Sequence, residues 1–151
     1  MSGVIVWPED RGFVTKYREG DVDLVTKRLA HEVSHQWWGH TLYPAQVEGG
    51  VTLVETMAKY SELLVMEAVQ GKVAIPAMLR YERELYTMSR ANMPFPEPTL
   101  LRAYSYDFVY YAKGAIVMDA LRDLIGEESL NRALRRLLQE HGGATNRPAH
   151  R

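Results

Sequence analysis

Two histidines four residues apart, with a glutamate directly after the first, are the residues of this sequence best suited to chemistry. They are His31, Glu32 and His35. On an α-helix, residues four apart are separated by about 40° around the axis and about 6 Å along it. Both imidazoles then face one point and could bind one metal ion, an arrangement that suits tetrahedral zinc with nitrogen ligands. The alternative is a surface helix with two histidines of no special role.

Glu32 lies beside the two histidines but points in a slightly different direction. It is about 60° from His35 around a helix, close enough to contact a water on the metal without itself binding the metal. Zinc lowers the pKa of such a water toward neutrality, and a neighbouring carboxylate can accept its proton as the water attacks a carbonyl group. We therefore predict that Glu32 is the general base of a hydrolytic site.

A catalytic zinc ion also needs a third protein ligand and an open fourth position. Glu55 is the candidate, because the loop before it contains a proline and two adjacent glycines that allow the next helix to fold back beside the first. Glu62 and Glu67 are rivals by residue type. Glu62 is one position away from the apolar face of its helix and could lie near a cleft, whereas Glu67 is expected to face solvent.

The elements that must position these residues are mostly helices. Apolar side chains recur every four residues from Val25 to Trp37. This pattern predicts a helix over about residues 23–38, with its apolar stripe packed and the histidines on the opposite side. The same reasoning predicts further helices over about residues 53–70, 75–90, 127–139 and within 107–125.

The N-terminus has a different pattern. Short β-branched and aromatic runs at residues 3–7 and 12–16 predict two strands joined by a turn. The expected fold class is therefore mainly α (α+β), with a short β-edge at the N-terminus.

Composition indicates one ordinary globular domain. The 151 residues are 46% hydrophobic, and 18 Lys+Arg against 19 Asp+Glu leave a net charge of −1, which gives no reason to expect a nucleic-acid or membrane-surface partner. The absence of cysteine excludes a disulfide scaffold and a cysteine nucleophile. We find no membrane-spanning stretch and no signal peptide. We expect a soluble chain, either cytoplasmic or on the extracytoplasmic side of a membrane assembly.

The stretch around the histidines resembles a known enzyme family. His-Glu-Val-Ser-His-Gln-Trp-Trp-Gly, followed by Glu55, Ala58 and Tyr60, is similar to the aminopeptidase N-type zinc metallopeptidases of the gluzincin clan. The family signature has eighteen residues between the second histidine and the glutamate, whereas this sequence has nineteen, which we interpret as a loop insertion. The neighbouring residues and the longer spacing resemble a bacterial branch whose members are often fused to, or encoded as part of, ABC-transporter permease proteins.

This resemblance implies a thermolysin-like catalytic core that holds one Zn²⁺ per chain through His31, His35 and Glu55. It implies hydrolysis of peptide substrates, by removal of their N-terminal residues. Tyr111 begins a Tyr-Ala-Lys-Gly segment similar to the family's Tyr-Glu-Lys-Gly, whose tyrosine stabilises the tetrahedral oxyanion. Tyr106 matches a tyrosine found in some members and is expected in the substrate-binding site.

Glu9 falls where the family has a glutamate that holds the free α-amine of the substrate. A carboxylate facing an ammonium group is a natural selector for a peptide N-terminus. Only this glutamate and the glycine three residues later agree with the family segment. The alternatives are therefore an amine anchor, which gives an aminopeptidase, or a solvated glutamate, which leaves endopeptidase specificity open.

The resemblance covers residues 3–141. We expect a catalytic core at residues 1–141, truncated relative to the family, and a flexible tail at residues 142–151. A core without the family's β-domain could form a homo-oligomer or associate with a transporter permease. The alternative function is a zinc-binding module without peptidase activity, or an interaction fragment of a membrane transporter assembly.

Overall fold

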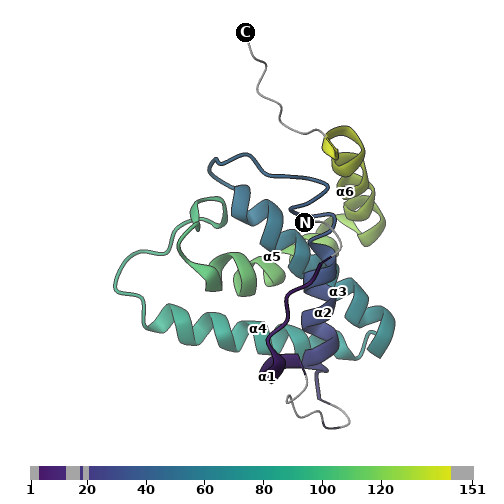
Figure 1. The fold of residues 1–151 in the computed structure, drawn as a ribbon. Coiled ribbons are helices and arrows are strands. Elements are labelled where there is room, and N and C mark those ends of the chain that lie inside the picture. Colours follow the sequence, from purple (N-terminus) through teal and green to yellow (C-terminus); the bar gives the residue numbers. More distant parts are fainter. Residues whose placement is uncertain (1–3, 13–17, 19–20, 144–151) are drawn as a thin grey trace.

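The computed structural model is mainly helical (Figure 1), which confirms the predicted mainly α class. It describes residues 4–12, 18 and 21–143. Two π-helical segments, the first π turn (Thr52–Thr56) and the second π turn (Val109–Lys113), lead directly into longer helices. The α-helices are α1 (Glu9–Gly12), α2 (Leu24–Ser34), α3 (Met57–Gln70), α4 (Ala74–Ala91), α5 (Gly114–Ile125) and α6 (Glu127–His141).

The predicted N-terminal β-edge is not found in the described residues. Residues 4–8 have no regular secondary structure, and α1 follows them at Glu9–Gly12. Residues 13–16 of the second predicted strand lie outside the described part. A strand needs a neighbour that satisfies its backbone N–H and C=O groups. Within the described part, the one β-type pairing is an isolated bridge between Trp38 and Leu42, so the N-terminal run has no partner strand there.

Asp23 caps the start of α2, close to the predicted start at about residue 23. Its side chain accepts hydrogen bonds from the backbone N–H groups of Val25 (3.0 Å) and Thr26 (3.1 Å), which satisfies two donors left free at the start of a helix. The helix ends at Ser34 rather than near residue 38. The chain then reverses at Gly39, whose φ of 121° is readily adopted only by glycine.

The buried face of α2 was predicted wrongly. The apolar stripe is largely exposed: Leu29 is 45% exposed, Val33 37% and Trp37 50%. Periodicity shows which residues share a face but does not show which face meets the rest of the protein. Here the side that packs against α3 is the side of the first histidine. Its buried residues are Lys27, Ala30, His31 and Ser34.

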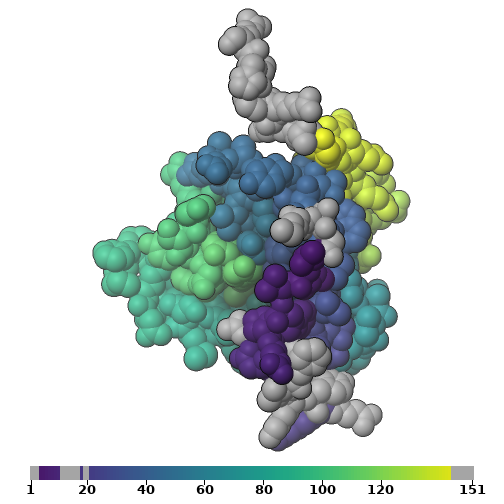
Figure 2. Space-filling view, in the orientation of Figure 1, coloured from purple at the N-terminus to yellow at the C-terminus, as the bar shows by residue number. Residues whose placement is uncertain are grey.

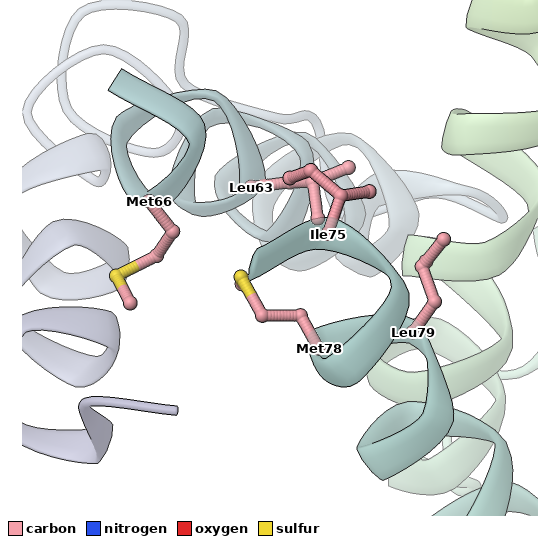
Figure 3. Packing of buried hydrophobic residues seen from close by; sticks show 5 residues of the cluster. All are labelled: Leu63, Met66, Ile75, Met78 and Leu79. Carbon is pink, nitrogen blue, oxygen red and sulfur yellow. The ribbon is translucent and has the colours of Figure 1, made fainter. Parts of the chain in front are cut away.

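Helix α3 is the centre of the packing, because it contributes to three clusters of buried side chains. Burial of one leucine or methionine side chain is worth about 1.5–3 kcal/mol, so these clusters hold the helices together. The first cluster joins α3 and α4 through Leu63, Met66, Ile75, Met78 and Leu79 (Figure 3). The second contains Trp38, Leu42 and Ala58, and the third contains Tyr60, Met118 and Leu130 from α3, α5 and α6.

The later helices lie where the sequence predicted them. α4 covers Ala74–Ala91, and Gly126, with a φ of 85°, separates α5 from α6. In α6 the leucines at 130, 134, 137 and 138 are buried or half-buried and form the packed face of the helix. No helix among the described residues is long and apolar enough to cross a membrane. The N-terminal segment, shown in purple in Figure 2, lies on the outside of the molecule.

Candidate metal centre

The side chains of the three predicted metal ligands converge. The Oε2 atom of Glu55 lies 3.2 Å from Nε2 of His31 and 3.4 Å from Nε2 of His35. Two atoms that are each about 2.0–2.1 Å from one zinc ion, at a tetrahedral angle, lie about 3.3 Å apart. The two distances from Glu55 to the histidines therefore fit tetrahedral zinc, and all three donor atoms lie within 4.8 Å of one another. Residues 4–12, 18 and 21–143 contain no second group of three such side chains.

The surroundings of the other ring nitrogen, Nδ1, support metal binding through Nε2 in both histidines. His35 Nδ1 lies 3.0 Å from the carbonyl oxygen of Trp38, and because a carbonyl can only accept, Nδ1 carries the proton. His31 Nδ1 is buried without a hydrogen-bond partner, and Glu62 Oε2 lies 3.4 Å away from it. Metal-binding histidines usually donate their other N–H to a carbonyl or carboxylate. Both rings are therefore arranged to offer Nε2.

The electrostatics of the group are dominated by the central carboxylate. Burial acts to raise the pKa of Glu55, but its contacts with His31 and His35 outweigh burial and lower that pKa to about 2. The same contacts work in the opposite sense on the imidazoles. Burial acts to lower the pKa of His31, but Glu55 and Glu62 raise it overall, and the hydrogen bond with Glu55 raises the pKa of His35. One carboxylate and two imidazoles form a donor set suited to a divalent cation.

Glu55 and Tyr111 both lie on π turns, which the sequence did not predict. A π turn closes its hydrogen bonds five residues apart instead of four, and such turns are frequent at functional sites. The two π turns are joined directly, since Thr56 Oγ1 donates a 2.6 Å hydrogen bond to the carbonyl oxygen of Tyr110. The position of the candidate ligand Glu55 is thereby tied to that of Tyr111.

Tyr111 and Glu32 line a common cavity of about 350 Å³ with the candidate ligand His31. The rings of Tyr111 and His31 have their centroids 5.6 Å apart. Burial and the nearby Glu55 carboxylate raise the pKa of Tyr111, so its phenol keeps its proton at neutral pH and is a hydrogen-bond donor. The structure thus places the Glu32 carboxylate, the Tyr111 phenol and the candidate ligand His31 around one cavity, and the catalytic roles of Glu32 and Tyr111 stay predictions.

A second and larger hollow, of about 650 Å³, is lined by Glu55 and the loop that precedes it. Leu101, Arg102 and Tyr104 line its other side. Because Glu55 contacts His31, the candidate metal centre borders both hollows.

Glu9 and Tyr106 are not among the described residues that line either hollow. Glu9 begins α1 and is exposed. Tyr106 is half-buried and packs edge-on against Phe108, with ring centroids 6.3 Å apart, and Phe108 itself lines the smaller cavity. Their roles in substrate binding stay predictions.

The two rival carboxylates occupy different environments. Glu67 lies in the last turn of α3, away from the candidate ligands, and pairs with Arg122, 2.6 Å away. Glu62 is 2% exposed and belongs to a group of four buried charges that the sequence analysis missed. The sequence does place one member of this group beside His31, because Lys27 lies one helical turn before His31 and so shares its face of α2. The other members are Lys59 and Glu82.

Comparisons with known proteins define the class of protein. The model of the Peptidase family M1 domain matches residues 13–149, so the chain belongs to peptidase family M1. Human endoplasmic reticulum aminopeptidase 2 is 30% identical over 123 residues, which are 77% of this chain and 13% of that protein. Aminopeptidase N of Lactobacillus delbrueckii subsp. lactis is 25% identical over 126 residues, 78% of this chain and 15% of that protein. No solved structure matches the chain.

The chain therefore spans less than a sixth of the length of these relatives. Their names are those of aminopeptidases, which confirms the resemblance to the aminopeptidase N-type family. No transporter protein is named among them, so they give no support to a transporter fragment. Association with a second copy of the chain stays a prediction.

Proposed function

We propose that this chain is the catalytic part of a zinc-dependent aminopeptidase, which removes N-terminal residues from peptides. The observation that carries the proposal is the convergence of the His31, His35 and Glu55 donor atoms at the spacing of a tetrahedral zinc shell. One Zn²⁺ bound there would lower the pKa of a water molecule and polarise a peptide carbonyl. Under this proposal, α2, the first π turn and α3 belong to the helical half of a thermolysin-like core.

Two residues of the smaller cavity would handle protons and charge. Glu32 follows a metal ligand directly in the sequence, and its carboxylate can accept a proton from the attacking water and deliver it to the leaving amine. The Tyr111 phenol can donate a hydrogen bond to the substrate carbonyl oxygen as negative charge develops on it.

The two hollows support a substrate that extends to both sides of the reacting bond. Glu55 borders one hollow and His31 borders the other, so a peptide lying across the centre would place one residue in each. Glu9 remains the candidate for the α-amine of the substrate, on the strength of the family resemblance. A substrate with a blocked amine separates aminopeptidase from endopeptidase activity.

The test uses the full chain loaded with zinc, alanine p-nitroanilide and its N-acetylated form. We expect about one zinc per chain, hydrolysis of the free-amine substrate only, loss of activity with a chelator and recovery with added zinc. Glu55→Gln should lose zinc and activity together. Glu67→Gln, the same change in the same helical segment but at a carboxylate paired with Arg122, should keep both.

Other outcomes have defined meanings. Hydrolysis that survives chelation contradicts the proposal. Hydrolysis of internal bonds in blocked peptides indicates an endopeptidase. Bound zinc without hydrolysis of any peptide favours the non-catalytic zinc-binding module.

A further inference from the structure

Four buried charged side chains form a closed group directly beside His31. We call this group the charge box: Lys27 from α2, Lys59 and Glu62 from α3, and Glu82 from α4. Lys27 Nζ lies 2.9 Å from Oε1 of each glutamate. Lys59 Nζ lies 2.8 Å from Oε1 of Glu62 and 2.6 Å from Oε1 of Glu82. None of the four side chains is more than 8% exposed.

Stability is a weak explanation for the charge box. Removing ionised groups from water is costly, and a buried ion pair is often no more stabilising than apolar side chains of the same volume. The box has two positive and two negative charges, so it is neutral and leaves no charge unpaired. Its position next to a candidate metal ligand suggests a different role.

The two lysines hold Glu62 in different ways. Lys59 donates hydrogen bonds to both of its carboxylate oxygens, at 2.8 Å to Oε1 and 3.1 Å to Oε2. The contact of Lys27 is an ion pair with Oε1. Oε2 is the oxygen that faces Nδ1 of His31, 3.4 Å away. Lys59 therefore fixes the direction in which the carboxylate presents Oε2.

His31 needs an acceptor at this place. Its Nδ1 atom is buried and has no hydrogen-bond partner within the described part of the chain. A neutral imidazole that gives Nε2 to a metal carries its proton on Nδ1. A buried N–H without an acceptor is unfavourable, and Glu62 Oε2 is the carboxylate oxygen beside it.

We propose that Lys59 is a positioning residue of the metal centre: by holding both oxygens of Glu62, it fixes Oε2 as the acceptor for the Nδ1–H group of His31. Lys27 and Glu82 balance the remaining charge. The inference rests on the proposed function, because it takes His31 to be a metal ligand. Under this proposal Lys59 acts through Glu62 and His31 and does not itself contact substrate or metal.

The experiment compares two double variants of the full chain that keep the box neutral. Lys59→Met with Glu82→Gln leaves Lys27 and Glu62, and removes the lysine that holds Oε2. Lys27→Met with Glu82→Gln leaves Lys59 and Glu62, and keeps that lysine. Zinc affinity is measured by competition with a chromophoric chelator, and the unfolding temperature of each zinc-free variant is measured in parallel.

We expect the variant without Lys59 to bind zinc about 10–100-fold more weakly than the parent. The variant without Lys27 should stay within about threefold of the parent. A purely structural box would lower the unfolding temperature of both variants without separating their zinc affinities. Equal zinc affinity in the two folded variants overturns the inference.

A measurement on the parent chain covers the case in which the variants do not fold. In the zinc-loaded parent, ¹⁵N NMR of the histidine side chains should show the His31 proton on Nδ1, in a hydrogen bond and protected from solvent exchange. A His31 ring with Nδ1 unprotonated overturns the inference. A parent chain that binds no zinc at all overturns the proposed function as well, so the two failures are distinguishable.

Discussion

The side chain of Thr56 fills the space that a Cβ atom on Gly114 would occupy. Such an atom would lie 2.6 Å from Thr56 Oγ1 and 2.9 Å from its Cγ2. Thr56 is fully buried, and its hydroxyl donates to the carbonyl oxygen of Tyr110. This contact joins the π turn that carries Glu55 to the π turn that carries Tyr111. The absence of a side chain at Gly114 therefore allows the two halves of the candidate site to approach each other.

A double-mutant cycle tests this contact. Gly114→Ala should lower the free energy of unfolding by about 1–3 kcal/mol, because the new methyl group has no room. Thr56→Ala should cost about 1–3 kcal/mol, because the Tyr110 carbonyl loses the hydrogen bond from the buried Thr56 hydroxyl. The double variant should cost at least about 0.5 kcal/mol less than the sum, because removing the Thr56 side-chain tip makes room for the methyl group. Urea denaturation measures all three, and strictly additive costs would contradict the close approach.

Glu32→Gln should leave zinc content unchanged and lower turnover of alanine p-nitroanilide by a factor of about 10²–10⁴. The amide keeps the size of the side chain but cannot accept a proton. Zinc is measured by elemental analysis and turnover by absorbance. Turnover equal to that of the parent would rule out Glu32 as the general base.

Tyr111→Phe should lower kcat by a factor of about 10²–10³, because the donor for the developing oxyanion is lost. KM and zinc affinity should change little, since the phenol is not a ligand. Tyr110→Phe is the matched control: its ring lies 4.8 Å from that of Tyr111, and we assign its hydroxyl no role. If both variants lose kcat equally, the effect belongs to packing of the two rings.

The contacts of Glu97 lead us to expect that the free energy of unfolding depends on pH. It accepts a 2.6 Å hydrogen bond from Tyr86 and pairs with Lys113 and Arg90. Burial acts to raise the pKa of Glu97, but the hydrogen bonds from Lys113 and Tyr86 lower it below its ordinary value overall. A carboxylate with a lowered pKa stabilises the fold fully above its unfolded pKa, and that stability is lost as the pH falls through the folded pKa.

Glu97→Gln should therefore lower the free energy of unfolding by up to about 1 kcal/mol at pH 7, and by less at pH 3. Thermal unfolding at the two pH values measures the difference. Glu140→Gln is the control, because Glu140 forms an exposed pair with Arg136 that should contribute at most about 0.5 kcal/mol at either pH. A constant effect of Glu97→Gln across this range would contradict the assignment.

The orientation of α2 can be tested by substitution on its exposed face. Val33→Ser should change the free energy of unfolding by no more than about 0.5 kcal/mol, because the side chain is 37% exposed. Leu63→Ala, in the cluster shared by α3 and α4, should cost about 2–5 kcal/mol. A large loss for Val33→Ser would instead support the buried stripe that the sequence predicted.

Some features of the fold and of the candidate site could be predicted from the sequence, and others could not. The His31–His35 pair was predictable because its geometry is local: four residues on a helix set the directions of both rings. The buried face of α2 was not predictable, because Lys27 is buried only where Glu62 and Glu82 arrive from two other helices. The π turns were missed for a related reason, since the hydrogen bond from Thr56 joins segments that are far apart in the chain.

The first π turn also shifts the phase of the helix that contains it. Each residue of an α-helix advances about 100° around the axis, and a turn closed five residues apart holds one residue more than a turn closed four apart. One helical wheel drawn over residues 52–70 would therefore mix two registers, one before and one after the first π turn. A π turn holds one residue more than an α turn, so it offers a second place, besides a loop, in which a chain can take up one extra residue between His35 and Glu55. Chains that differ by one residue here could keep the same glutamate at the metal and absorb the difference as a change of helical phase.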